Sequence, residues 1–171
     1  MADNTPAPQR AGAVIAGVVP GQSPRVLRAA ARQAALAGTE LVIAHVDTTR
    51  FVAFEDPDGY ISPTAVDVAG AAARAALAEV QAAADAALAG ETVSWSVRQV
   101  IGDPALALIH LADELDASLL VVGTRKRGLG ESLREFLTGS VAARLTHRQH
   151  RPVLVVPLGE SLAPEEELVW E

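Results

Sequence analysis

The sequence predicts a single α/β domain built on a doubly wound, five-stranded parallel sheet. Three observations support this prediction: short apolar runs alternate with helical stretches, polar-proline pairs precede two of the helices, and one strand candidate has a polar face. Strands that alternate with helices form parallel β-α-β units joined by right-handed crossovers. With 171 residues, of which 50% are hydrophobic, the chain is long enough to fill one core.

Four of the strand candidates consist of apolar or small residues, with His45 as the exception, which indicates burial on both faces. They are residues 13–19, 41–46, 118–122 and 153–156. Residues 92–100 differ, because Val93, Trp95 and Val97 alternate with polar residues in the period of a strand with one wet face. We expect the strand order 3-2-1-4-5, which places this third strand at one edge of the sheet and the last strand at the other.

The helix boundaries are predicted by local signals. A side-chain oxygen followed by proline is typical of an N-cap and the first helical position, and a glycine is typical of a helix end. The polar-proline pairs are Ser23-Pro24 and Asp103-Pro104, and the terminating glycines are Gly38 and Gly90. We therefore expect helices over residues 24–37, 64–89 and 104–115, and a last helix that Gly139-Ser140 opens.

Composition and charge exclude several classes of protein. No run of about eighteen apolar residues is present, so we expect no membrane span. The absence of cysteine excludes disulfides and thiolate chemistry, and residues 1–10 do not have the pattern of a secretory signal. The formal net charge of −7 argues against a nucleic-acid binder. We expect a cytoplasmic protein without nucleic-acid or membrane partners.

The positive charge is concentrated in one region. Residues 125–151 contain seven Lys or Arg against Glu131 and Glu135, whereas the rest of the chain has 19 acidic and 7 basic residues. For most of these charges a solvated surface with an acidic C-terminal tail is a sufficient interpretation. The basic excess beside a glycine-containing loop would nevertheless attract a small anionic ligand.

The expected fold also predicts where a ligand would bind. In an open parallel sheet, ligands lie beyond the carboxyl ends of the strands where the order reverses, here between the first and fourth strands. The segments that meet there are residues 18–23, Asp47, residues 101–103 and the loop from Gly123 onward. Glycines leave backbone amides open, and the helix that follows Gly139-Ser140 offers free N–H groups to an anion.

Four stretches carry a resemblance to a known family: VIAGV with its Ser-Pro helix start, LVIAHV, GDPALALIHLADELDASLLVVGTR and TGSVAARLTHRQHRPVLVVPL. Over about residues 11–158 the chain resembles the universal stress proteins. The resemblance implies a Rossmann-like fold of the adenine nucleotide alpha hydrolase-like type over these residues. Outside them, the composition predicts a disordered segment at 1–10 and an acidic tail at 159–171. Many members bind ATP or another adenine nucleotide, and most have no established catalytic activity.

The nucleotide motif of the family is only partly present. ATP-binding members carry G-x2-G-x9-G-[ST] after the fourth strand, and here Gly123 and Gly139-Ser140 match its two ends. Lys126 stands where the second glycine belongs, and the next glycine, Gly128, comes two residues late. Binding members usually carry an Asp after the first strand, but residues 17–23 read GVVPGQS. The basic loop could hold a different anion, or it could fold into the pocket and fill it.

The resemblance and the strand ends together define the candidate binding residues. They are Val19, Val46, Gly102, Asp103, Gly123, Thr124, Arg125, Gly128, Gly139, Ser140 and Val141. Asp103 has a simpler alternative role as a helix cap. His45, inside an apolar strand, is expected to be a hydrogen-bonded core residue. We expect no metal site, because His147 and His150 have no third ligand nearby in the sequence.

Three functions follow in order of preference. The first is a dimeric stress-response binding module with weakened or altered nucleotide recognition. The second is a regulatory switch that binds ATP or AMP through the loop from Gly123 to Ser140. The third is an enzyme such as an ATPase, against which stands the absence of a G-x4-G-K-[ST] loop and of recognisable catalytic pairs.

The expected dimer rests on the last strand, residues 152–158. This strand is apolar throughout although the strand order places it at an edge, and an unpaired apolar edge is prone to aggregation. The same strand of a second subunit would cover it in a two-fold arrangement, as the family resemblance also implies.

Overall fold

The computed structural model describes residues 12–48, 63–124 and 140–159, with the side chains of residues 63–67 excepted. Its strands are β1 (Val14–Val18), β2 (Leu41–Asp47), β3 (Trp95–Ile101), β4 (Leu119–Gly123) and β5 (Val153–Val156). They form one parallel sheet of order β3-β2-β1-β4-β5. The predicted fold class and strand order are therefore confirmed.

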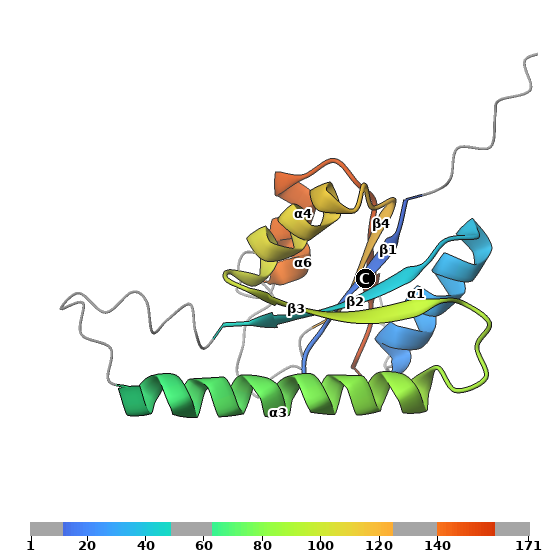
Figure 1. Cartoon of the computed structure of the whole chain (residues 1–171). Helices are drawn as coiled ribbons and strands as arrows, with labels where there is room; N and C mark the ends of the chain where they lie inside the picture. Colours follow the sequence, from blue (N-terminus) through green and yellow to red (C-terminus); the bar gives the residue numbers. More distant parts are fainter. Residues whose placement is uncertain (1–11, 49–62, 125–139, 160–171) are drawn as a thin grey trace, which may run out of the picture.

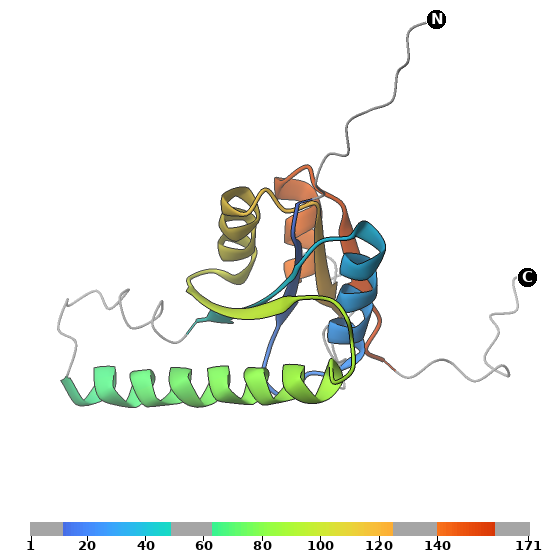
Figure 2. The ribbon, with the colours of Figure 1, turned by 45° about the vertical axis from the view of Figure 1, so that its right-hand side comes forward.

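Helices cover both faces of this sheet (Figures 1 and 2). They are α1 (Arg25–Ala37), α3 (Pro63–Ala87), α4 (Pro104–Glu114) and α6 (Val141–Arg148). Figure 1 shows α1 and α3 on one face and α4 and α6 on the other. The expected doubly wound arrangement, with a helix between successive strands, is thus present.

Alternation along the strands divides the core into two clusters. In β1, Val14 and Ala16 pack with α1 and α3, whereas Ile15 packs with α4 and α6. All three side chains are at most 1% exposed. A strand buried on both faces is what the continuous apolar run predicted.

The third strand is the edge strand that its alternating sequence predicted. Half-buried and exposed residues alternate from Trp95 to Gln99, and within the described sheet β3 pairs with β2 alone. The strand begins at Trp95 rather than at residue 92, because its pairing with β2 starts at Trp95 opposite Leu41. β5 occupies the other edge of the described sheet.

The two polar-proline pairs open their helices with different quality. Asp103 is the N-cap of α4, and its carboxylate accepts hydrogen bonds from the N–H groups of Ala105 and Leu106, both at 3.1 Å. Before α1, Ser23 Oγ accepts a single long bond of 3.4 Å from the N–H of Arg25. The Asp103 prediction is confirmed. The Ser23 prediction is wrong, because Pro24 occupies the N-cap position of α1 and no side chain caps this helix.

The predicted glycine stops are confirmed for α1 and approximate for α3. Gly38 ends α1 with φ +63°, a left-handed conformation that glycine adopts without steric cost. The α3 helix ends at Ala87, two residues earlier than predicted, and Gly90 follows in a turn with φ +85°.

Candidate functional site

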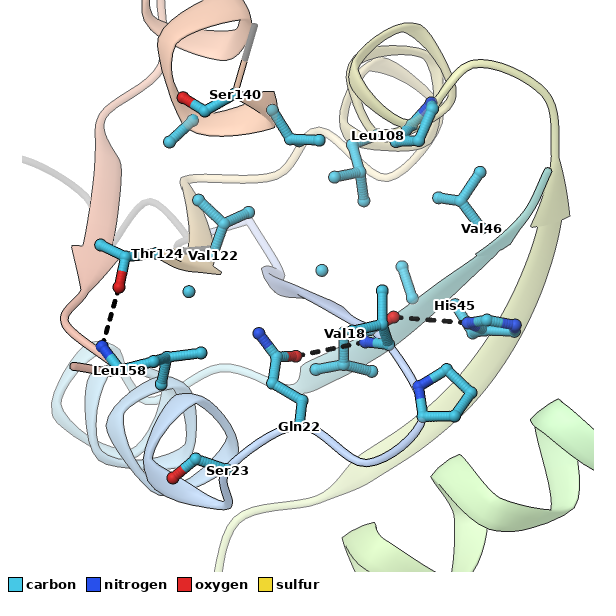
Figure 3. Close-up of a pocket in the computed structure, with 18 of the residues that line it drawn as sticks. Val18, Gln22, Ser23, His45, Val46, Leu108, Val122, Thr124, Ser140 and Leu158 are labelled. Carbon is cyan, nitrogen blue, oxygen red and sulfur yellow. Dashed lines mark hydrogen bonds between the residues drawn. The ribbon is translucent and has the colours of Figure 1, made fainter. Parts of the chain in front are cut away.

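A cavity of about 600 Å³ lies at the carboxyl ends of β1 and β4, where the strand order reverses (Figure 3). It is the position at which open α/β sheets bind ligands. Its described wall consists of residues 17–23, residues 44–46, Thr48, Pro104, Leu108, residues 122–124, residues 140–142 and Leu158. Every strand end that borders the switch point therefore contributes to one space.

The turn between β1 and α1 forms one wall of the cavity. The N–H of Gln22 donates to the carbonyl of Val19 at 3.2 Å, and Gly21 has φ +68°. Proline at the second position and a left-handed glycine at the third are the features of a type II turn. This turn directs the Gln22 side chain into the cavity, as Figure 3 shows.

One part of the cavity is apolar. Val46 at the end of β2 and Leu108 on α4 lie together on one side, with Val18 below them (Figure 3). Val19 borders the same space and is 59% exposed. An apolar wall of this kind suits the faces of a heteroaromatic ring.

The opposite part carries polar side chains. Thr124 Oγ1 accepts a hydrogen bond from the N–H of Leu158 at 2.8 Å, and Ser140 Oγ caps α6 by accepting from the N–H of Ala143 at 3.1 Å. A hydroxyl that accepts one bond still has its own proton to donate. The first N–H groups of α6 lie beside Ser140 and favour a negative charge. This part of the wall therefore presents donors.

Gly123 allows the end of β4 to lie close to the β1–α1 turn and to Leu158. A Cβ atom at this position would lie 2.5 Å from Gln22 Nε2, 2.7 Å from Leu158 Cδ1 and 3.0 Å from Val26 Cγ2. Any other residue here would therefore have to displace the ends of the Gln22 and Leu158 side chains. Close approach, rather than backbone conformation, favours glycine at this position. The end of β4 is thereby packed directly against the β1–α1 turn.

Charged side chains tie α4 to α6 beside the cavity. Arg144 donates two hydrogen bonds to the carboxylate of Asp103, each of 2.7 Å. These hydrogen bonds are the main reason that the pKa of Asp103 is lowered. Burial acts in the opposite direction and raises this pKa, whereas the hydrogen bond from the N–H of Leu106 lowers it further. The same contact raises the pKa of Arg144. The pair fixes the N-terminus of α4 against the helix that Ser140 begins.

The structure brings together six of the eleven candidate binding residues. Those that line the cavity are Val19, Val46, Gly123, Thr124, Ser140 and Val141. Gly102 and Asp103 do not line it, and Asp103 instead caps α4 and pairs with Arg144. Arg125, Gly128 and Gly139 lie outside the described residues.

Several lining residues were not among the eleven candidates. Gln22 lies in the turn before α1, within the segment 18–23 that was expected at this site, whereas Leu108 on α4 and Leu158 after β5 were not expected there. Of these, Gln22 alone had a signal in the sequence, since it is the polar residue in the turn where the family places its Asp. Leu108 and Leu158 look like ordinary core residues until the packing is known.

His45 is the buried histidine that the sequence predicted. It is 6% exposed, and its Nδ1 lies 3.4 Å from the carbonyl oxygen of Val18. Within the described ranges, no group of three or more His, Cys, Asp and Glu side chains could hold a metal ion. The helices described here also include none long and apolar enough to cross a membrane.

Comparisons with known proteins agree with this architecture. The model of the universal stress protein family matches residues 14–157. A solved universal stress protein in complex with cAMP is 30% identical, with 88% of this chain and 100% of that chain covered and a TM-score of 0.59. A member of the family from Burkholderia pseudomallei is 28% identical over 87% of this chain and 98% of that one, with a TM-score of 0.58.

More distant structures share the fold. The hypothetical protein MJ0577 is 17% identical and has a TM-score of 0.67, with 90% of this chain and 100% of that chain covered. No curated protein matches the chain significantly. The family match spans most of the sequence and all five strands. This chain therefore belongs to the universal stress protein family.

Proposed function

We propose that this protein is a cytoplasmic regulatory module that binds an adenine nucleotide in the cavity between β1 and β4. The observation that carries the proposal is the division of this cavity into an apolar part and a donor-rich part at the switch point. A nucleotide has the same division, because its base is flat and largely apolar on its faces and its phosphate is anionic. The 30% identical relative was solved with cAMP.

The orientation of the nucleotide follows from the chemistry of the wall. The base would lie against Val46 and Leu108, and the phosphate would lie near Thr124, Ser140 and the N-terminus of α6. Backbone N–H groups at a helix start bind phosphate without a basic side chain. Among the described lining residues there is neither a carboxylate nor Lys or Arg, so the wall supplies neutral donors.

Recognition of ATP is altered in this proposal. The turn of residues 17–23 has no carboxylate, and Lys126 replaces the second glycine of the family motif. We therefore expect AMP and cyclic AMP to bind at least as well as ATP. The protein would act by binding rather than by catalysis, and phosphate release from ATP should not exceed that of a buffer blank.

Thermal unfolding with AMP, cyclic AMP, ATP and no ligand tests the proposal. A ligand present at 100 times its dissociation constant adds about 2.7 kcal/mol to stability, which raises the Tm by several degrees. If none of the nucleotides raises the Tm at millimolar concentration, the proposed function is wrong.

Two substitutions at one position locate the phosphate. Ser140→Asp keeps a capping oxygen for α6 but places a negative charge where the phosphate would lie. Ser140→Ala removes the cap and adds no charge. We expect Ser140→Asp to abolish the nucleotide-dependent rise in Tm and Ser140→Ala to retain part of it. A nucleotide-dependent rise in Tm that neither variant reduces would indicate that the phosphate lies elsewhere.

We also propose a homodimer through β5 and its flanking residues 152–158. β5 lies at the edge of the described sheet, with Val155 37% exposed and Val153, Leu154 and Val156 half-buried. A second copy would pair with this edge and cover it. Sedimentation at micromolar concentration should give twice the mass of 17.7 kDa, and a monomer would contradict the proposal.

A further inference from the structure

The side-chain amide of Gln22 has a fixed orientation. Its Oε1 accepts a hydrogen bond from the N–H of Val19 at 3.2 Å, within the same turn that the Gln22 N–H closes. Oxygen and nitrogen of a glutamine amide are distinguished by their partners, and a backbone N–H can only face the oxygen. Nε2 and its two protons therefore point away from the turn.

The direction in which Nε2 points is toward the end of β4. The closest approach to a Cβ built on Gly123 comes from this nitrogen, at 2.5 Å. Figure 3 shows the amide reaching into the side of the cavity that carries Thr124 and Leu158. Gln22 thus adds a donor to the polar part of the wall.

Gln22 gives this turn the opposite hydrogen-bonding character to that of the Asp that nucleotide-binding members of the family usually carry here. An Asp side chain accepts hydrogen bonds and would contact the donors of a ligand, such as hydroxyl or amino groups. Gln22 uses its acceptor within the turn and presents only N–H to the cavity. A ligand atom beside it must be an acceptor, and phosphoryl oxygens accept the strongest hydrogen bonds.

We infer that Gln22 is the specificity-determining residue of the cavity and that its Nε2 donates to a phosphoryl oxygen of the bound nucleotide. The inference rests on the proposed function and deepens it, because it assigns the selection of phosphorylated ligands to one side chain. With Gln22, the site favours a nucleoside monophosphate over the nucleoside that lacks the phosphate.

Calorimetric titration of the full chain with AMP and with adenosine tests the inference. Gln22→Glu retains the oxygen that accepts from Val19 but replaces the donor with a negative charge. A hydrogen bond to a charged group contributes enough that its loss weakens binding about 10- to 150-fold. We expect a loss of this size for AMP and a change of less than about twofold for adenosine.

Gln33→Glu on α1 is the matched control, since it makes the same chemical change away from the cavity wall. It should leave both affinities unchanged. Gln22→Met, which removes the donor without adding charge, should show the same preference with a smaller loss.

The outcomes separate the inference from the proposed function. If Gln22→Glu weakens AMP and adenosine equally, or weakens neither, the inference is overturned while nucleotide binding stands. If the wild-type protein binds neither ligand, both the inference and the proposed function fail.

Discussion

The starts of α1 and α4 are two regions with the same sequence signal and different structures. A polar-proline pair stands at the start of each helix, at the carboxyl edge of the sheet: α1 begins after Ser23-Pro24, and α4 begins at the proline of Asp103-Pro104. Asp103 receives two backbone hydrogen bonds at 3.1 Å and two more from Arg144 at 2.7 Å. Ser23 receives one at 3.4 Å.

The difference separates a structural helix start from one that borders a ligand site. Asp103 directs its oxygens toward α4 and α6 and does not line the cavity, whereas Ser23 and the neighbouring Gln22 do. The start of α4 is stabilised by a distant partner, Arg144. The start of α1 instead presents polar groups to the cavity, which is the pattern expected of a functional site.

We expect the largest effect from Gly123→Val, which disturbs the packing of β4 against the start of α1. The added side chain would collide with Gln22, Leu158 and Val26, and overpacking of this kind typically costs about 1–3 kcal/mol. Urea unfolding should show this loss, and nucleotide binding should disappear with it. Gly159 has no atom within 4 Å of its Cβ position, so Gly159→Val is the matched control and should change stability by less than about 0.5 kcal/mol.

We expect the second largest effect from Asp103→Ala, at the start of α4. It removes the cap and both contacts of Arg144, and loss of a cap alone costs about 0.5–2 kcal/mol. The exposed pair Arg98–Glu114 serves as the control, because Glu114→Ala should cost no more than about 1 kcal/mol. Equal losses from Asp103→Ala and Glu114→Ala would show that the α4–α6 contact is no stronger than a surface pair.

The contribution of Asp103 to stability should depend on pH, with a smaller effect than that of Asp103→Ala. The pKa of Asp103 is lower in the folded protein than its ordinary value of 3.8. Its contribution to stability is therefore fully present above about pH 5 and is lost as the pH falls through the folded pKa. Urea unfolding should show the stability gap between wild type and Asp103→Asn shrinking as the pH falls below 4. A gap that stays constant down to pH 2 would contradict the ion pair.

Ser23→Ala should have the smallest effect. The hydrogen bond of 3.4 Å is long, so its removal should cost less than about 0.5 kcal/mol, below the range of a well-formed cap. Thermal unfolding without ligand measures this difference. A loss as large as that of Asp103→Ala would show that the two helix starts are equivalent after all.

Periodicity and local signals were sufficient to predict the strand order, the edge position of β3 and the cap at Asp103. These features depend on neighbours in the chain or on the alternation of a strand, and both are visible in a sequence. The strand ends also predicted the position of the cavity, and together with the family resemblance they identified Val19, Gly123 and Ser140.

The remaining features depend on contacts between distant segments. Gln22 and Leu158 are 136 positions apart and meet at Gly123, a packing relation that no local pattern encodes. Asp103, which does not line the cavity, pairs with Arg144, 41 positions away in the sequence. Whether the basic loop of residues 125–139 completes the site remains a prediction, because these residues lie outside the described structure.

Leu158 gives the cavity a connection to the edge of the sheet. Its N–H is held by Thr124, its side chain lines the cavity, and it follows β5 by two residues. If a nucleotide binds in this cavity and a second copy pairs with β5, as proposed, Leu158 is the residue through which the two events would be coupled. By thermodynamic linkage, each would then change the affinity of the other by the same factor.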